Sequence, residues 1–156
     1  MYETDYSIAL RQAQTMDAWE LAELRFASLA EMGLLQPVQA PGFIRRAASE
    51  FFTLLREDRL TAWLLVEGNR PVGCACVIFW DRLPYANTSL HAEICGVYVL
   101  PEFRRRGYAT ELVGEAVAGA RGRGARKIVL SSTESAREIY RRLGFKDETQ
   151  MVTRLE

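Results

Sequence analysis

The stretch "VLPEFRRRGYATELV", residues 99–113, joins an apolar strand-like run to a segment with helical periodicity. Its turn contains three consecutive arginines and Gly107. Backbone N–H groups at a helix start have no intrahelical acceptor, and the helix dipole adds partial positive charge there. Glycine also lets the backbone adopt unusual conformations and lets a ligand approach closely. The stretch therefore predicts either a solvated charge cluster or an anion site between a strand and a helix.

The helix that follows this turn is clearly amphipathic. Its apolar residues recur at the spacing i, i+3, i+4, i+7, i+8 and i+11, and they are Ala109, Leu112, Val113, Ala116, Val117 and Ala120. Together with a strand at 91–100 and another at 126–132, this helix forms a β-α-β crossover. The turn at 101–107 therefore lies where a strand ends and a crossover helix begins.

The remaining sequence predicts helices and strands in the order β-α-α-β-β-β-α-β-α-β. Gly33 ends a first helix that begins near Thr15 or Asp17, and Gly144 ends the last one. Other expected elements are a strand at 6–12, a helix near 43–57, two strands within 60–80 around a turn at 67–70, a helix at 135–144 and a strand at 150–155. The fold class is therefore α/β (α+β), with a mixed sheet flanked by helices, in a single domain over 1–156.

Composition excludes several classes of partner. Twenty basic and twenty acidic side chains cancel, so no net field attracts nucleic acid or an anionic membrane. No apolar run approaches the roughly 20 residues that span a bilayer, and the first residues lack the features of a signal peptide. We therefore expect no nucleic-acid or membrane partner and a cytoplasmic location.

The three cysteines are expected to be buried thiols in a reducing compartment. Cys74, Cys76 and Cys95 are odd in number and lie in apolar stretches. The C-x-C pair has no second ligand pair, so no metal site is predicted. The chain also has neither G-x-x-x-x-G-K-[ST] nor G-x-G-x-x-G, which disfavours nucleotide hydrolysis and dinucleotide redox chemistry.

Two motifs resemble one known family. Arg104-x-x-Gly107-x-Ala109, after a strand that ends Val97-Tyr98-Val99-x-Pro101, resembles the acyl-CoA signature of the GNAT superfamily of N-acetyltransferases. The segment "AREIYRRLGF" (136–145) resembles the family's A-x-x-x-Y-x-x-x-G-F motif, and the element order matches over essentially the whole chain. The resemblance implies a mostly antiparallel sheet with splayed central strands, about four helices, and acetyl-CoA as cosubstrate.

The resemblance also implies where acetyl-CoA binds. Backbone groups of residues 105–110 would bind its pyrophosphate, and those of Val97 and Val99 would pair with the pantetheine arm and the thioester as an added strand. Gly96 would suit a bulge in that strand. Thr133 stands where the family often has asparagine. The implied cofactor-binding residues are Val97, Tyr98, Val99, Arg104, Arg105, Arg106, Gly107, Tyr108, Ala109, Thr110, Thr133, Ala136 and Tyr140.

Acetyl transfer to an amine requires an acid and a base. An alkyl ammonium with a pKa of about 10 must lose a proton before it attacks, and the thiolate leaves more easily beside a proton donor. Tyr140 occupies the family's tyrosine position and is the candidate donor, with a core tyrosine as the alternative. A second group, a base beside the amine, is needed to accept the proton that the ammonium loses.

Glu93 is the candidate base. Odd-numbered residues of a regular strand share one face, which aligns Glu93 with His91, Cys95 and Val97. Glu93 also precedes Arg104 by the same interval that separates the base glutamate from the corresponding motif position in the superfamily's histone acetyltransferases. A structural carboxylate remains the alternative, and His91 is the other candidate base. Cys95 is disfavoured as an acylated nucleophile because direct transfer needs no covalent enzyme intermediate.

The acceptor is expected to contact the early helices and the loop before the central strand, roughly 26–44 and 80–91. Aromatic rings with a few carboxylates suit a small amine with an apolar part, or else form core or a homodimer interface. The residues are Phe26, Met32, Leu34, Phe43, Trp80, Asp81, Tyr85, Asn87 and Glu93. The leading hypothesis is an N-acetyltransferase for a small-molecule amine. The alternatives are a protein or peptide N-acetyltransferase and a non-catalytic acyl-CoA sensor.

Overall fold

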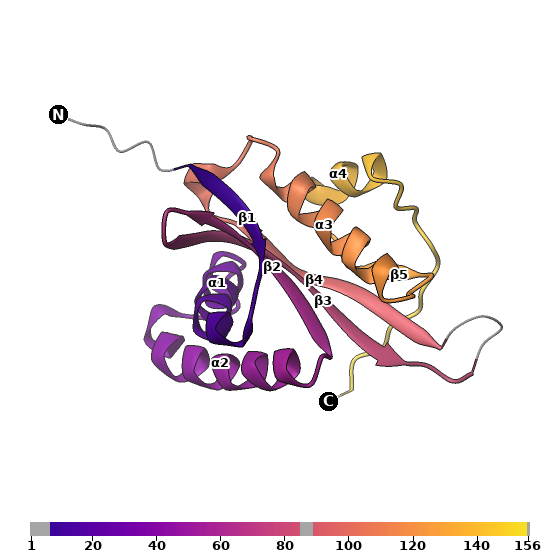
Figure 1. Cartoon of the computed structure of the whole chain (residues 1–156), viewed down its shortest axis with the longest axis horizontal. Helices are drawn as coiled ribbons and strands as arrows, with labels where there is room; N and C mark the ends of the chain where they lie inside the picture. The colour runs from indigo at the N-terminus through magenta and orange to yellow at the C-terminus, as the bar shows by residue number, and fades with distance from the viewer. Residues whose placement is uncertain (1–6, 85–88, 156) are drawn as a thin grey trace.

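The fold is built on one five-stranded sheet. The computed structural model describes residues 7–84 and 89–155. The strands follow the sheet in sequence order, and neighbours are antiparallel except for the last pair, which is parallel. They are β1 (Ile8–Gln12), β2 (Leu60–Glu67), β3 (Arg70–Asp81), β4 (Leu90–Val99) and β5 (Ile128–Leu130) (Figure 1). The mixed, mostly antiparallel sheet agrees with the prediction.

Helices cover both faces of this sheet. Figure 1 shows α1 (Ala18–Glu31) and α2 (Ala40–Arg56) on one face, and α3 (Tyr108–Gly122) and α4 (Arg137–Arg142) on the other. Short 3-10 turns directly precede α1, α2 and α4, and another follows β4. They lie at Thr15–Asp17, Pro37–Gln39, Glu134–Ala136 and Pro101–Phe103, respectively. In the described residues, no helix combines the length and apolar character that crossing a membrane requires.

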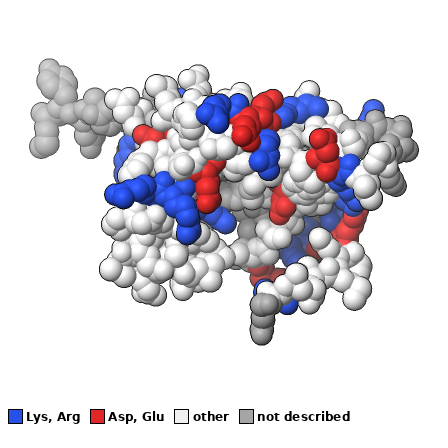
Figure 2. All heavy atoms as spheres, turned by 90° about the horizontal axis from the view of Figure 1, so that it is seen from below, with Lys and Arg blue, Asp and Glu red and all other residues white. Residues whose placement is uncertain are grey.

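Charges of both signs are mixed on the surface. On the face shown in Figure 2, Lys and Arg side chains lie beside Asp and Glu side chains rather than in a continuous basic stripe. Within the chain, Arg11 and Asp17 form an ion pair, with Nη2 and Oδ1 2.8 Å apart. The two signs of charge, which balance over the whole sequence, are therefore also mixed on this face.

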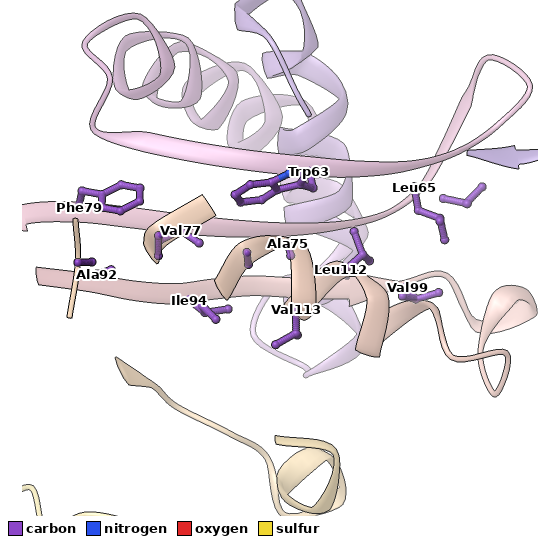
Figure 3. Close-up of a cluster of buried hydrophobic side chains, with 14 of the residues drawn as sticks. Trp63, Leu65, Ala75, Val77, Phe79, Ala92, Ile94, Val99, Leu112 and Val113 are labelled. Atoms are coloured by element: carbon purple, nitrogen blue, oxygen red, sulfur yellow. The ribbon is translucent and has the colours of Figure 1, made fainter. Parts of the chain in front are cut away.

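The core consists of two apolar layers that share β2. Every residue of β2 except the last is buried, as expected for a strand covered on both faces. Trp63 and Leu65 pack toward α3, whereas Leu64 and Val66 pack toward α1 and α2. Figure 3 shows the α3 layer, in which Val113 belongs to the same cluster as Trp63. This alternation along one strand fixes the sheet between its helices.

A bulge interrupts β4. The pairing with β3 steps from Cys76–Cys95 directly to Cys74–Tyr98, so β4 has one more residue than β3 between these pairs. Gly96 lies there with φ of 63°, a left-handed conformation that glycine adopts without strain. The bulge expected from Gly96 is therefore present.

The bulge changes which residues of β4 share a face. Ala92 and Ile94 pack in the α3 layer, and so do Val97 and Val99 beyond the bulge. We expected the odd-numbered residues of this strand to share one face. That expectation was wrong beyond position 95, because the extra residue reverses the alternation. Glu93 therefore lies on the opposite face from Val97.

β4 and β5 pair over only a short stretch, in the first half of β4. Their register runs from Ala92–Ile128 to Ile94–Leu130 and ends there. β4 continues to Val99, while the chain after β5 turns away into Glu134–Ala136 and α4. Within the described residues, positions 95–99 thus have no strand partner on this side, which is the predicted splaying of the central strands.

The final strand expected at 150–155 does not form. The segment has no regular structure, and its apolar residues Met151 and Val152 are exposed. Alternating polarity is not sufficient for a strand, because a strand needs a neighbour to which it can hydrogen-bond. The last helix also begins at Arg137, after a 3-10 turn, rather than at 135.

Candidate functional site

The turn between β4 and α3 contains two left-handed residues. Arg105 has φ of 62° and Gly107 has φ of 82°, and α3 begins at the next residue, Tyr108. A Cβ atom added at Gly107 would meet no heavy atom within 4 Å. The space above Gly107 is therefore open, and it is the backbone conformation, not crowding within the chain, that favours glycine.

Consecutive N–H groups of this turn are free. In the described residues, the N–H groups of Arg105, Arg106 and Gly107 donate to no acceptor. Those of residues 108–110 form the first turn of α3, where no intrahelical acceptor exists. Amides in a left-handed turn at a helix N-terminus form a concave anion-binding surface. We call residues 105–110 the amide turn.

The three arginines next to the amide turn differ in their contacts. Arg104 donates to Glu31 at the end of α1, with Nη1–Oε1 at 2.8 Å and Nη2–Oε2 at 2.7 Å. Arg106 donates to the carbonyl of Glu102 at 3.2 Å. Arg105 forms no hydrogen bond or ion pair within the described residues. Of the three guanidinium groups, that of Arg105 is the most available to a ligand.

Tyr98 belongs to the same cluster as Arg104. The Arg104 guanidinium lies 5.5 Å from the Tyr98 ring centroid. Burial, followed by a hydrogen bond to Glu31, raises the pKa of Tyr98 to about 12, so its hydroxyl stays protonated at neutral pH. The Arg104 hydrogen bonds hold the pKa of Glu31 below its usual value. This cluster is a charged hydrogen-bond network rather than a proton-transfer site.

The open edge of β4 lies beside the amide turn. Two carbonyls of β4 near this edge accept side-chain hydrogen bonds: Gly96 from the Cys74 thiol of β3 at 3.2 Å, and Val99 from Arg104 Nε at 2.8 Å. Val97, between them, packs in the α3 layer. Of the backbone groups predicted to pair with an added strand, the Val99 carbonyl is therefore partly engaged within the chain.

Tyr140 lies on α4, on the α3 face of the sheet. Its ring packs against the α3 layer and meets Phe145 edge-on, with the centroids 5.9 Å apart. Burial raises the pKa of the Tyr140 hydroxyl, and within the described residues this hydroxyl has no hydrogen-bond partner. A half-buried phenol without a partner is able to donate to a ligand atom.

Glu93 lies on the other face, with His91 and Cys95. The His91 ring packs against Trp80, with the centroids 4.4 Å apart. Burial, followed by Arg82 and Lys127, lowers the pKa of His91, while Glu93 opposes this effect. Burial raises the pKa of the Cys95 thiol to about 12, so Cys95 is not a thiolate at neutral pH.

The two candidate catalytic residues therefore lie on opposite faces of the sheet. No hydrogen bond or ion pair joins Glu93 to Tyr140. Between them, β4 and β5 diverge beyond Ile94. A molecule held at this divergence would have Tyr140 on one side and Glu93 on the other.

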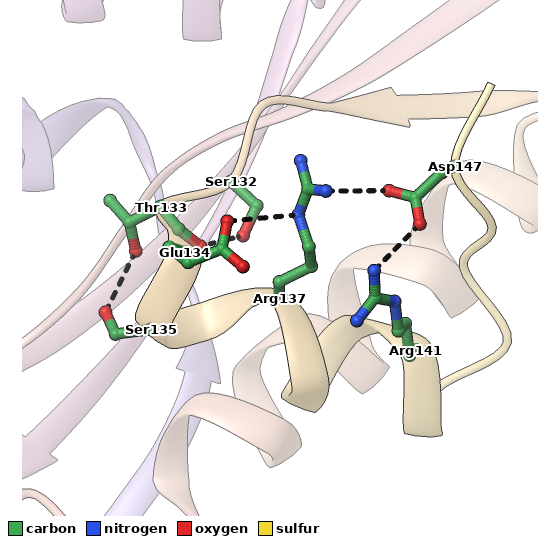
Figure 4. Close-up of polar contacts among 7 residues, drawn as sticks. All are labelled: Ser132, Thr133, Glu134, Ser135, Arg137, Arg141 and Asp147. Atoms are coloured by element: carbon green, nitrogen blue, oxygen red, sulfur yellow. Dashed lines mark hydrogen bonds and ion pairs between the residues drawn. The ribbon is translucent and has the colours of Figure 1, made fainter. Parts of the chain in front are cut away.

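The residues that follow β5 form a polar segment before α4 (Figure 4). Thr133 Oγ1 and Ser135 Oγ are 3.2 Å apart, and Ser132 Oγ donates to the Thr133 carbonyl at 2.7 Å. Thr133 is exposed, and Ala136 is half-buried where the 3-10 turn ends. The Thr133 hydroxyl is therefore at the surface, although a neighbouring serine partly engages it.

Ion pairs attach α4 to the segment that follows it. Asp147 contacts Arg137 Nη1 at 3.3 Å and Arg141 Nη2 at 2.9 Å, and both contacts are visible in Figure 4. Arg137 also lies 4.0 Å from Glu134. These contacts tie the helix that carries Tyr140 to the C-terminal segment.

The residues expected to contact an acceptor are only partly brought together. The Phe26 and Phe43 rings of α1 and α2 contact each other, with the centroids 6.0 Å apart. Met32 and Leu34, in the connection between these helices, are exposed, as is Trp80 on β3. Asp81, the last residue of β3, is exposed as well, and Tyr85 and Asn87 lie outside the described residues.

A separate hollow lies between β1 and α3. It has a volume of about 520 Å³, and none of the predicted site residues lines it. Its lining residues are Leu10, Arg11, Gln12, Trp63, Glu111, Gly114 and Glu115. Two carboxylates on its wall make it unsuited to an anion, so we do not place the anion site there.

Sequence reasoning missed Glu31. This residue contacts Arg104 across 73 positions of sequence, a separation at which no local pattern indicates a contact. One signal was present: a carboxylate in the last turn of a helix opposes the helix dipole and is favoured only beside a cation. The position of Glu31 before Gly33, the expected end of that helix, could have prompted a search for such a partner.

Comparison with known proteins identifies the family. The family model described as "Acetyltransferase (GNAT) family" matches residues 19–145, most of the chain. The chain belongs to the GNAT family of acetyltransferases. A relative in Methanocaldococcus jannaschii, named as an uncharacterized N-acetyltransferase, is 32% identical over 102 residues. That match covers 63% of this chain but only 44% of the relative's length.

Solved structures share this GNAT fold. One, from Clostridium acetobutylicum, is described as a predicted acetyltransferase with acetyl-CoA; it has a TM-score of 0.84 and 24% identity over 96% of each chain. A GCN5-related N-acetyltransferase from Ralstonia eutropha has a TM-score of 0.81 and 22% identity, over 96% of this chain and 99% of the other. The family and fold class inferred from the two motifs are therefore confirmed. The roles of individual site residues stay predictions.

Proposed function

We propose that this chain transfers an acetyl group from acetyl-CoA to a primary amine of a small molecule, by direct attack. The observation that carries the proposal is the amide turn, in which consecutive free N–H groups border the open edge of β4. Membership of an acetyltransferase family supplies the reaction class. The geometry of the turn supports a donor with a phosphate group.

The residues present fit coenzyme A. Its pyrophosphate would accept hydrogen bonds from residues 105–110, where the open space above Gly107 leaves room for it. The exposed Arg105 guanidinium would pair with a further anionic group. The pantetheine arm would lie along β4 beyond Ile94, where β5 has diverged, with the polar segment around Thr133 facing it.

In the proposed reaction, a neutral amine attacks the thioester carbonyl carbon. A C–N bond forms, the C–S bond breaks, and the electron pair of that bond leaves on sulfur as a thiolate. The proton lost by the amine passes to Glu93, directly or through water. His91 is the alternative acceptor, because its lowered pKa keeps the imidazole neutral at pH 7.

Tyr140 would act on the leaving thiolate. Its raised pKa lies above the roughly 8.5 of a thiol, so complete transfer of the phenol proton to sulfur is uphill. The hydroxyl would therefore stabilise the developing negative charge mainly as a hydrogen-bond donor. The free hydroxyl of Tyr140 and its position opposite Glu93 support this role.

The proposal is tested by calorimetric titration with acetyl-CoA, followed by an amine screen that measures release of free coenzyme A thiol. Small primary amines and peptide N-termini or lysines are compared in the same assay. Saturable binding with thiol release only for small amines is the expected result. Release only for peptides would replace the acceptor class, and binding without release would favour an acyl-CoA sensor. No binding would overturn the proposal.

A further inference from the structure

Arg104 is held in place by three residues from two elements, α1 and β4. Its Nη1 and Nη2 donate to the two carboxylate oxygens of Glu31 at 2.8 and 2.7 Å, and its Nε donates to the carbonyl of Val99 at 2.8 Å. The guanidinium also lies 5.5 Å from the Tyr98 ring centroid. A bidentate pair with a third hydrogen bond fixes both the position and the plane of the guanidinium. We call these four residues the Arg104 clamp.

The Arg104 clamp immediately precedes a strained residue. Arg105 is not glycine, yet it has φ of 62°. A left-handed conformation disfavours a residue with a Cβ, so neighbouring contacts must hold it. Upstream, the clamp anchors Arg104 to β4 through Val99 and to α1 through Glu31; downstream, α3 begins at Tyr108. The amide turn is thus fixed at one end by the Arg104 clamp and at the other end by α3.

Glu31 is the member of the clamp that comes from a distant part of the chain. It is the last residue of α1, where the helix dipole disfavours a carboxylate. The Arg104 hydrogen bonds compensate for this and hold the pKa of Glu31 below its usual value, so the carboxylate is ionised at neutral pH. The side chains of Arg104 and Glu31 remain 40% and 43% exposed, so solvent weakens the pair.

We propose that Glu31 is a positioning residue for acetyl-CoA: by holding Arg104, it keeps the free N–H groups of the amide turn in the arrangement that binds pyrophosphate. This inference rests on the proposed function, because it concerns the same donor site. It assigns the Arg104 guanidinium mainly to shaping the turn, and leaves Arg105 as the arginine that pairs with the ligand. Glu31 itself would not touch the donor.

The first test compares Glu31→Gln with a matched control, Asp58→Asn. Asp58 is the acidic partner of Arg123 at the other end of α3, and neutralising it makes the same change in charge. We expect Glu31→Gln to raise the calorimetric Kd and the KM for acetyl-CoA roughly three- to tenfold, with kcat within about twofold of wild type. Asp58→Asn is expected to leave all three values unchanged.

The second test is a double-variant cycle with Arg104→Gln. If Glu31 acts only through Arg104, adding Glu31→Gln to Arg104→Gln should weaken binding no further. Thermal unfolding of each variant shows whether the fold is intact at the assay temperature. Wild-type affinity in Glu31→Gln, an equal loss in Asp58→Asn, or additive losses in the cycle would overturn the assignment while leaving the proposed function standing. No binding by the wild type would overturn both.

Discussion

Each end of α3 has an arginine that makes the same three kinds of contact, but we expect the two ends to have different roles. Near its N-terminus, Arg104 contacts Glu31, the Val99 carbonyl and an aromatic ring. At its C-terminus, Arg123 contacts the Asp58 carboxylate at 3.3 Å and the Asp58 carbonyl at 2.7 Å, and lies 4.0 Å from the centroid of another ring, that of Phe79. Each arginine thus joins an acid, a backbone carbonyl and a π-face.

What differs is the backbone beside each arginine. At the N-terminal end the amide turn has free N–H groups and open space at Gly107. At the C-terminal end α3 packs closely on β2, and a Cβ added at Gly119 would lie 2.4 Å from a Trp63 ring atom. Gly107 therefore borders open space, where the proposed ligand would bind, and Gly119 faces the core. Substitutions at the N-terminal end should therefore affect binding, and substitutions at the C-terminal end should affect stability.

The largest effect on binding is expected from Gly107→Glu, at the N-terminal end of α3, where the space above the turn is open. The carboxylate would repel pyrophosphate and occupy the space above the turn, and φ of 82° disfavours any residue with a Cβ. Acetyl-CoA affinity should fall by more than about a hundredfold, equivalent to about 3 kcal/mol, in calorimetric titration. Normal affinity in a folded Gly107→Glu protein would show that the donor does not use the amide turn.

The next largest effect is expected from Tyr140→Phe. Phenylalanine keeps the ring contact with Phe145 but removes the hydroxyl that would stabilise the thiolate. Because a thiolate is already a fair leaving group, kcat should fall roughly ten- to a hundredfold, near the lower limit for loss of acid catalysis. The Kd for acetyl-CoA should stay within about threefold. An unchanged kcat would leave Tyr140 as a core residue.

A smaller effect on kcat/KM should show whether Glu93 or His91 is the base. Glu93→Gln is expected to lower kcat/KM about tenfold or more at every pH, whereas His91→Asn should stay within about threefold. If His91 were the base, Glu93→Gln would keep its activity. The acidic limb of its pH–rate profile would then move to lower pH, because Glu93 raises the pKa of His91. The pH profile of kcat/KM for wild type and both variants decides between them.

The conformation of the turn proposed to bind the donor was predictable because its signals are local. Strand, turn, Gly107 and helix lie within a few residues of one another, and the consequences of a left-handed glycine before a helix are set by backbone geometry. The bulge at Gly96 was expected for the same reason. Its effect on the faces of β4 was not, because alternation along the sequence does not show where an extra residue is inserted.

The contacts around the amide turn that come from distant parts of the sequence were less predictable. Glu31 and Arg104 meet through the packing of α1 beside β4, and no local pattern encodes that pairing. The strand expected at 150–155 does not form for a related reason: its pattern was suitable, but a strand also requires a neighbour. Local sequence therefore predicts the elements and the amide turn better than it predicts which distant side chains meet.

The smallest effect on catalysis is expected from substitutions at two glycines of α3. They also give the sharpest test of its C-terminal end, which packs closely on β2 and which we call the closed end. Gly119→Ala gains helix propensity worth about 1 kcal/mol, but its Cβ would overlap the rigid Trp63 ring. The free energy of unfolding should therefore fall by about 1–2 kcal/mol. Gly114→Ala is the matched control, because a Cβ there meets no atom within 4 Å, and it should raise that free energy by about 0.5–1 kcal/mol.

Chemical denaturation of both α3 variants measures these changes, and kcat and the KM for acetyl-CoA should stay within about twofold of wild type in each. The opposite signs matter more than the sizes, since both substitutions are Gly→Ala in one helix and differ only in what the new methyl group meets. Stabilisation by Gly119→Ala would mean that Trp63 moves aside at little cost. A rise in KM for acetyl-CoA in either variant would mean that the closed end of α3 also shapes the donor site, and the division between the two ends would fail.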